Sequence, residues 1–210
     1  AEVNDENFPG LLGSDSINIV YIGRGGADMR RSVIPVFEAL QSALKEDRSA
    51  FSCLKFYFIG TSYAPASKGK ATIAPLAEKY GISDQVIEIT DRISYYHALT
   101  TLMQANALFV PGSDDSGYTA SKIYLYLLTG KPLLAVFNAE SPAIGVLKEY
   151  GAANVYDYKS VSQHSIISFL KQVSDGSIQA AAYNSEAVNK YSARQITLQQ
   201  CLLFNQVVNG

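Results

Sequence analysis

The first residues whose types and spacing suggest chemistry form a short loop of glycines with one arginine: Gly23, Arg24, Gly25 and Gly26. Glycines allow a backbone to approach a ligand closely, and a helix beginning just after the loop would offer free N–H groups to an anion. Arg24, Arg30 and Arg31 could each add a charge-assisted hydrogen bond to a phosphate oxygen, of about 1.5–3 kcal/mol. The loop therefore predicts a phosphate site, with a tight glycine turn flanked by solvated arginines as the alternative.

A second candidate lies in the polar stretch 111–122, PGSDDSGYTASK. Its small and hydroxyl-bearing residues, among them Ser116, Gly117 and Tyr118, supply donors and acceptors for phosphate and for sugar hydroxyls. Lys122 stands in the first turn of the helix expected next, where a cation opposes the helix dipole unless an anion is bound. A bound anion is one explanation of this stretch, and a solvated acidic loop is the other.

Arg92 and Ile93 form a third, shorter candidate, just after an apolar run that ends at residue 89. A backbone at this position can pair with the edge of a nucleotide base, and Ile93 can cover the face of that base. A helix cap made by Asp91 or Ser94, beside an exposed arginine, explains the same residues. Both interpretations stay open on the sequence alone.

Several better-defined motifs fail when they are tested. Asp28 stands where a dinucleotide-binding fingerprint needs glycine, and both Gly-Lys pairs continue with Ala71 or Pro132 where a P-loop needs serine or threonine. His97 and His164 are far apart, and neither lies near a cysteine or a carboxylate pair at metal-ligand spacing. We therefore expect no nicotinamide or other cofactor and no metal ion, and the catalytic residues stay unknown at this level.

Alternating apolar and amphipathic stretches indicate which elements must position these loops. Apolar runs suited to buried strands cover residues 17–22, 54–59, 86–89, 107–110, 133–137 and 154–156. Patterns suited to helices cover residues 28–46, 71–80, 94–104, 120–128 and 143–150, with two more helices at 160–173 and 184–208. This alternation predicts an α/β fold, a doubly wound, Rossmann-like parallel sheet of about six strands with helices on both faces and extra C-terminal helices. Ligands of such sheets bind outside the carboxyl ends of the strands, where all three candidate loops lie.

Composition limits the remaining function classes. The 210 residues are 48% hydrophobic and 17% charged, with a formal net charge of −2 and no basic cluster larger than the arginine pair, so nucleic-acid binding is disfavoured. No apolar run approaches the roughly 18 residues of a membrane span, so membrane contact is expected only through a missing domain, if at all. Cys53 and Cys201 are far apart beside apolar residues, which favours buried free thiols and a cytoplasmic location. Residues 1–16 indicate a linker or entry segment, and residues 17–210 indicate one domain.

Three features, taken in order, carry a resemblance to a known family. The first is IVYIGRGGADMRRSVIPVFEAL, the second is LKFYFIGTS followed later by ANALFVPGS, and the third is GYTASKIYLYLLTGKPLLA. In this order they resemble the C-terminal, donor-binding half of GT-B glycosyltransferases of the family-4-like, group 1 kind. The resemblance runs from about Ile17 to Val208 and includes the family's closing helix.

The resemblance implies a domain that binds a nucleotide-diphosphate sugar as substrate. The sugar would pass to a glycan or lipid-linked acceptor held by the N-terminal domain of the same enzyme, which lies outside this sequence. The residues that it carries over are Arg24 with Arg30 or Arg31 at the diphosphate, Arg92 and Ile93 at the base, and Ser116, Gly117 and Tyr118 at the sugar and phosphates.

One departure from the family pattern concerns the ribose. The family's Glu-x7-Glu motif places its second glutamate where this chain has Leu125, and the first glutamate is also absent. Leucine cannot accept a hydrogen bond from a ribose hydroxyl, so the alternative to a transferase is a non-catalytic or degenerate domain that kept the fold. Helical spacing predicts that Ile123 and Leu127 face the core and that Leu125 turns toward the cleft.

Overall fold

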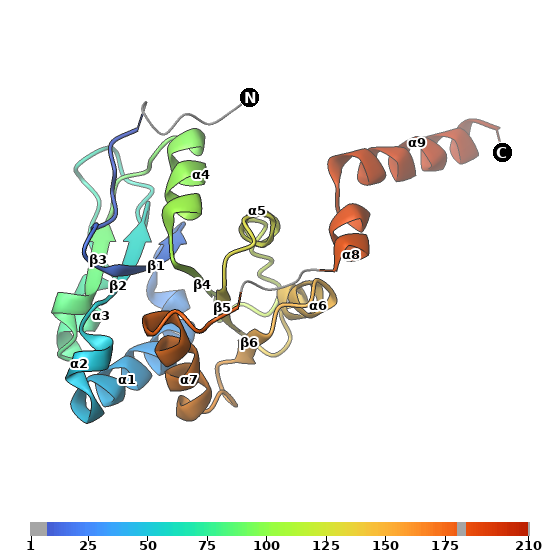
Figure 1. Cartoon of the computed structure of the whole chain (residues 1–210). Coiled ribbons are helices and arrows are strands. Elements are labelled where there is room, and N and C mark those ends of the chain that lie inside the picture. The colour runs from blue at the N-terminus through green and yellow to red at the C-terminus, as the bar shows by residue number, and fades with distance from the viewer. Residues whose placement is uncertain (1–7, 180–183, 210) are drawn as a thin grey trace.

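Six parallel strands form a single sheet in the computed structural model, which describes residues 8–179 and 184–209 (Figure 1). The strands are β1 (Ile17–Ile22), β2 (Leu54–Ile59), β3 (Val86–Ile89), β4 (Ala107–Pro111), β5 (Leu133–Phe137) and β6 (Asn154–Asp157). Their order in the sheet is β3-β2-β1-β4-β5-β6. The order reverses between β1 and β4, and this confirms the doubly wound sheet predicted from the sequence.

The helices connect the strands in the alternation expected from the sequence. They are η2 (Ala27–Met29), α1 (Arg30–Glu46), α2 (Arg48–Phe51), α3 (Ala74–Lys79), η3 (Ser83–Gln85), α4 (Tyr95–Gln104), α5 (Ile123–Leu128), α6 (Pro142–Glu149), α7 (Gln163–Ser174), α8 (Ser185–Lys190) and α9 (Ala193–Asn209). Several begin at a side-chain cap, such as Ser94 before α4 and Ser162 before α7, because the hydroxyl oxygen accepts a bond from a free N–H of the first turn.

Two hydrophobic cores lie on opposite faces of the sheet. Strand residues alternate between them, so that Ile19 and Tyr21 enter one core while Val20 enters the other. Helices α1, α2, α3 and α7 cover the first face, and α4, α5 and α6 cover the second (Figure 1). Burial on both faces explains why the strands are short continuous apolar runs rather than alternating patterns.

Some element boundaries differ from the sequence expectation for identifiable reasons. The helix expected at 71–80 begins at Ala74, because the carboxylate of Glu88 accepts hydrogen bonds from the N–H groups of Thr72, Ile73 and Ala74. The single helix expected at 184–208 is two, α8 and α9, which are separated at Tyr191. Of the linker expected at 1–16, residues 1–7 lie outside the described residues.

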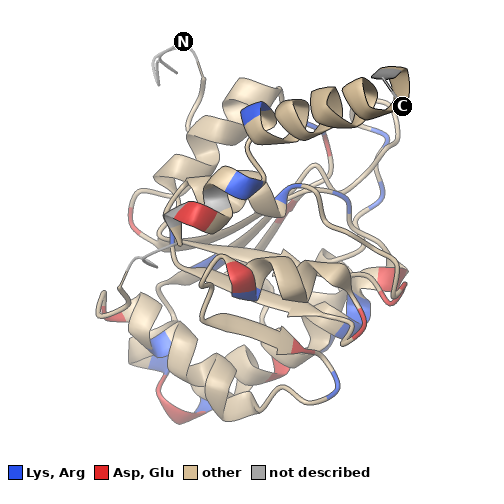
Figure 2. Cartoon of the chain, turned by 90° about the vertical axis from the view of Figure 1, so that its right-hand side faces the viewer, with Lys and Arg blue, Asp and Glu red and all other residues tan. Residues whose placement is uncertain are grey.

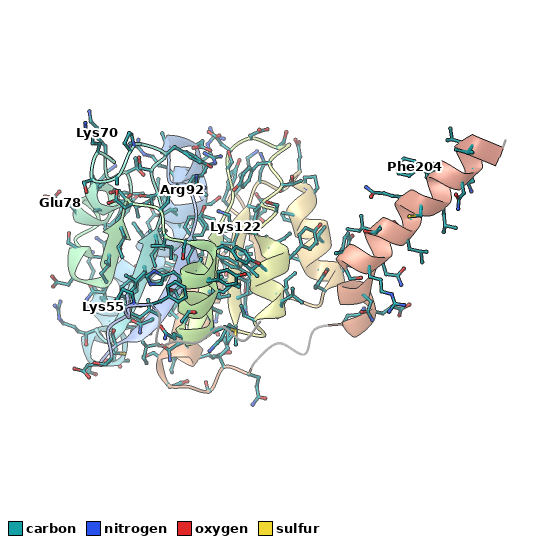
Figure 3. All side chains as sticks on the ribbon, turned by 90° about the horizontal axis from the view of Figure 1, so that it is seen from above. Lys55, Lys70, Glu78, Arg92, Lys122 and Phe204 are labelled. Atoms are coloured by element: carbon teal, nitrogen blue, oxygen red, sulfur yellow. The ribbon has the colours of Figure 1, made fainter. Side chains whose placement is uncertain are left out.

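The C-terminal segment leaves the body of the domain after α8. Helix α8 is tied to α6, since Lys190 Nζ lies 2.6 Å from a carboxylate oxygen of Glu149 and the Tyr191 ring stacks on Tyr150. Helix α9 then projects away, and its apolar residues, including Phe204, are exposed (Figures 1 and 3). Cys201 on α9 is also exposed, so the expectation that both cysteines are buried was wrong for this one, while Cys53 is half-buried.

A membrane-spanning helix is not found in the described part of the chain, where each helix is too short or too polar to cross a bilayer.

Candidate functional site

A cleft of about 370 Å³ opens at the carboxyl ends of the central strands. It lies at the switch point between β1 and β4, the place where open parallel sheets bind ligands. Four loops contribute to it, after β1, β2, β3 and β4. The lining residues are Ile22, Gly23, Arg24, Ile59, Gly60, Tyr63, Arg92, Ile93, Tyr118, Thr119, Ser121 and Lys122.

Backbone hydrogen bonds hold the loops after β1, β2 and β3 side by side. The N–H of Gly23 donates to the carbonyl of Ile59 at 2.8 Å, and the N–H of Gly25 donates to that of Thr61 at 2.8 Å. Gly60 in turn donates to the carbonyl of Ile89 at 2.8 Å. The pairing of the sheet thus continues past the strand ends, and it brings Arg24 and Arg92 to one cleft.

Three cations reach this cleft, and each lies over a tyrosine ring. The distance from the cation to the ring centroid is 5.1 Å for Arg24 over Tyr118, 4.8 Å for Arg92 over Tyr63 and 4.5 Å for Lys122 over Tyr21. Such contacts attract a cation to the face of a ring, and the attraction itself uses none of the cation's N–H donors. Figure 3 shows Arg92 and Lys122 over the centre of the domain, whereas Lys70 and Glu78 lie at its periphery.

Lys122 is the most buried of these cations. Burial lowers the pKa of its ammonium group to about 8, and the positive charges of Arg24 and Arg92 act in the same direction. A charged lysine in this position is costly in the free protein, because desolvation and like charges both oppose it. An anion in the cleft would remove much of that cost, so the site favours anionic ligands.

Tyr21 supports Lys122 from below the cleft. Its hydroxyl accepts a hydrogen bond from Lys122 Nζ at 3.0 Å and donates one to the backbone oxygen of Arg24 at 2.9 Å. The ring is 1% exposed, and burial raises the pKa of the phenol well above its ordinary value. Tyr21 therefore stays protonated and contacts both the Arg24 backbone and the Lys122 side chain.

Tyr126 fixes the start of α5, from which Lys122 projects. Its buried hydroxyl accepts a hydrogen bond from the N–H of Ile22 at 2.7 Å and donates one to the Ile22 carbonyl at 3.1 Å. Burial raises the pKa of this phenol, so it keeps the proton that it donates. This pair of bonds ties α5 to the end of β1 and sets the distance between Lys122 and the glycine loop.

Arg24 is held in place by Asp28. Its guanidinium makes two bonds to the carboxylate, of 2.6 and 3.1 Å, and Ser113 donates a third at 2.8 Å. Burial opposes the charge on Asp28, but the hydrogen bonds from Arg24 and Ser113 outweigh it and hold the carboxyl pKa below its ordinary value. Both side chains remain partly exposed, at 28% and 32%, so Arg24 is ordered and still accessible.

Glycine at position 23 leaves room for the Lys122 side chain in its present position. A Cβ there would collide with the Lys122 ammonium group and would lie 2.8 Å from the Tyr21 hydroxyl. Gly60 has a φ of +74°, a conformation that favours glycine, and it passes close to the backbone of Arg92. Gly23 therefore makes room for Lys122, and Gly60 supplies a positive φ at the end of β2.

Six of the residues expected from the sequence line the cleft: Gly23, Arg24, Arg92, Ile93, Tyr118 and Lys122. The other six expected residues lie outside its lining: Gly25, Gly26, Arg30, Arg31, Ser116 and Gly117. Gly25 and Gly26 shape the turn into η2, and the two arginines begin α1 with exposed side chains. Gly117 belongs to the loop whose later residues Tyr118 and Thr119 line the cleft, and its N–H donates to the Asp115 carboxylate at 2.9 Å.

Sequence reasoning missed Tyr21, which supports Lys122, and four residues of the lining: Ile22, Ile59, Gly60 and Tyr63. Gly60 and Tyr63 belong to the loop after β2, which lies beside the loop after β1 because β2 is the neighbour of β1 in the sheet. Tyr21 falls inside the apolar run 17–22, which by itself predicts only a strand. Its place two residues before a glycine loop is the one sequence signal of its role.

Leu125 does not face the cleft as expected. It is half-buried, packs against the core on the second face of the sheet, and is not among the residues that line the cleft. The expected core positions Ile123 and Leu127 are buried, but Tyr126 is buried between them. The buried side of α5 is therefore wider than predicted, and it takes in Leu125.

Comparison with solved structures identifies the fold. WaaG, a glycosyltransferase involved in lipopolysaccharide biosynthesis, matches 85% of this chain with a TM-score of 0.57 and 17% identity. S. aureus TarM, solved with fondaparinux, α-GlcNAc-glycerol and UDP, matches 98% with a TM-score of 0.62 and 15% identity. The pneumococcal O-GlcNAc transferase GtfA, solved with UDP and GlcNAc, matches 94% with a TM-score of 0.62 and 12% identity.

The chain spans less than half of each of these three proteins, between 37% and 43% of their length. No protein-family model and no curated protein sequence matches it. The structural matches confirm the GT-B glycosyltransferase-like fold that the sequence resemblance implied.

Proposed function

We propose that this chain is the C-terminal, donor-binding half of a two-domain GT-B glycosyltransferase, and that its cleft binds the diphosphate of a nucleotide-activated sugar. The observation that carries the proposal is the convergence of Arg24, Arg92 and Lys122, from three different loops, at one cleft. Three cations in a small site match the charge of a diphosphate, and their hydrogen bonds to phosphate oxygens are among the strong ones in proteins.

The chemistry of the proposed reaction explains why three cations would be useful. When the bond between sugar and phosphate breaks, its electron pair leaves with the diphosphate, and negative charge grows on that group. Cations already held in place stabilise this charge without reorganising during the reaction. Asp28 holds Arg24, and Tyr21 holds Lys122, so two of the three cations are positioned before the ligand arrives.

The remaining lining residues suit the other parts of a nucleotide sugar. Ile93 and the backbone of Gly60 provide a surface for a base, and the hydroxyls of Thr119 and Ser121 can bond to ribose or sugar. UDP in the TarM and GtfA structures supports this ligand class. The acceptor, a glycan or a lipid-linked molecule as in polysaccharide biosynthesis, would bind to an N-terminal domain of the same enzyme.

Further parts of the proposal concern the partner domain and the compartment. A second domain is supported by the share of the matched glycosyltransferases that this chain spans. The exposed apolar side chains of α9 are consistent with contact to such a domain. A cytoplasmic location is supported by Cys53 and Cys201, which are both free.

A second candidate function is a non-catalytic domain that kept the fold. The observation that favours it is Leu125, which is half-buried and packs against the core where the family motif has a ribose-binding glutamate. Calorimetric titration with UDP and with GDP distinguishes the two candidates. Binding in the micromolar to millimolar range supports the donor-binding domain, and an absence of binding with both nucleotides supports the non-catalytic domain.

A further inference from the structure

We infer that the cleft recognises its ligand mainly through the diphosphate and discriminates little between nucleosides. The inference rests on the proposed function. It adds that the diphosphate is the part of the donor that determines affinity. It follows from how charge, carboxylates and hydroxyls are distributed around the cleft.

Positive charge dominates the lining of the cleft. Arg24, Arg92 and Lys122 come from the loops after β1, β3 and β4, and within the described residues no carboxylate lines the cleft beside them. Each cation lies over a tyrosine ring, and two of them use part of their donors within the protein, Arg24 on Asp28 and Lys122 on the Tyr21 hydroxyl. The strongest contacts available to a nucleotide are therefore contacts to its phosphates.

Four carboxylates of the surrounding loops already accept hydrogen bonds from the protein itself. Asp28 accepts from Arg24 and Ser113, and Asp91 accepts from the N–H of Ser67 at 2.8 Å. Asp115 accepts from the N–H of Gly117, and Glu88 accepts from Thr61 and from the backbone before α3. A ribose diol would have to compete with these bonds, so it gains little from these four carboxylates.

The polar side-chain groups left for base and ribose are hydroxyls. Tyr63, Thr119 and Ser121 line the cleft, and each hydroxyl can rotate to donate or to accept a hydrogen bond. A group that can do both pairs equally well with the acceptor edge of one base and the donor edge of another. Ile22, Ile59 and Ile93 offer apolar contact to any base. These contacts favour bases in general and select none in particular.

The test is a competition titration on the whole chain with four probes: inorganic pyrophosphate, UDP, GDP and uridine. We expect pyrophosphate, UDP and GDP to bind within about tenfold of one another, a range of about 1.4 kcal/mol, and uridine to show no measurable binding. Lys122→Met should weaken all three phosphate ligands by a similar factor. Arg48→Ala serves as the control, because this exposed arginine begins α2 at the opposite ends of the strands.

The outcomes separate this inference from the proposed function. If UDP binds far more tightly than both pyrophosphate and GDP, by about a hundredfold or 2.7 kcal/mol, the inference is wrong while the donor-binding function stands. If pyrophosphate binds but Lys122→Met leaves its affinity unchanged, the phosphates bind elsewhere and the inference is also wrong. If none of the phosphate ligands binds, the proposed function fails and the inference fails with it.

Discussion

The hydroxyl of Tyr21 accepts a hydrogen bond from Lys122 Nζ at 3.0 Å and donates one to the backbone oxygen of Arg24 at 2.9 Å. The buried Tyr21 side chain on β1 therefore contacts both the Lys122 ammonium group, from the loop after β4, and the Arg24 backbone, from the loop after β1. These loops are about a hundred residues apart in the sequence, and their relationship depends on strand β4 lying next to β1.

Tyr21→Phe tests this positioning role. The ring under Lys122 stays, but the bonds to Lys122 and to Arg24 are lost, so each cation gains freedom that a ligand must remove. We expect affinity for UDP to fall by about two- to tenfold, which corresponds to one ordinary hydrogen bond. Calorimetry across pH should also show a changed midpoint for Lys122, a result that loss of packing alone would not produce.

Lys122→Met should separate binding from stability. The loss of one charge-assisted contact should weaken UDP binding by roughly 10- to 100-fold. Thermal stability at pH 7 should hold or rise, because the variant removes a desolvated ammonium group. A variant that loses stability and affinity together would show that Lys122 is a structural residue.

The pH dependence of stability provides a further check on Lys122. Its pKa is lowered from 10.5 to about 8 in the folded chain, so between these values the unfolded chain binds more protons. The free energy of unfolding should therefore rise with pH from about 8 to 10.5, and this increment should disappear in Lys122→Met. Denaturant titrations at about pH 7.5 and pH 10 measure this increment. The first pH lies about half a unit below the window, and the second lies about half a unit below its upper end.

Arg24→Ala should reduce affinity for nucleoside diphosphates by about 10-fold or more, the effect of one charge-assisted hydrogen bond. Its effect on melting temperature should be small, because the ion pair with Asp28 is partly exposed and such pairs contribute little. Arg48→Ala, at the other end of the strands, should leave both quantities unchanged. Equal affinities in all three proteins would exclude Arg24 from the site.

Leu125→Glu should destabilise the domain without improving nucleotide binding. Leu125 packs against the core, and a carboxylate there loses hydration without gaining a partner. Thermal melting should show a clear decrease, which added UDP does not restore. A variant of normal stability that binds UDP more tightly would instead place this position at the ribose.

The sequence predicted the strands and the loops that border the cleft well because both depend on local patterns. Apolar runs located every strand to within a residue, and glycine with arginine after β1 indicated the cleft. Tyr63 and Tyr21 could not be predicted in the same way, since their roles depend on which loops the strand order brings together. The prediction that Leu125 faces the cleft was wrong because Tyr126 widens the buried side of α5. Periodicity alone did not show that the Tyr126 hydroxyl reaches the end of β1.

Figure 2 shows that α9 carries almost no charge beyond its first turn, which is unusual for an exposed helix. The helix expected at 184–208 includes this segment, and Ile196, Leu202 and Phe204 on α9 are exposed. A helix of this composition that packs against a neighbour would normally bury such residues.

Mapping of backbone amide shifts by NMR with UDP tests the central claim most directly, because it reports both binding and its place. We predict that millimolar UDP shifts the amides of Gly23, Gly60 and Tyr118, and that Lys122→Met reduces these changes. The amides of Lys55 and Asp84, at the opposite ends of the strands, should stay in place. An unchanged spectrum, or shifts confined to residues away from the cleft, would contradict the assignment of this chain as a donor-binding domain.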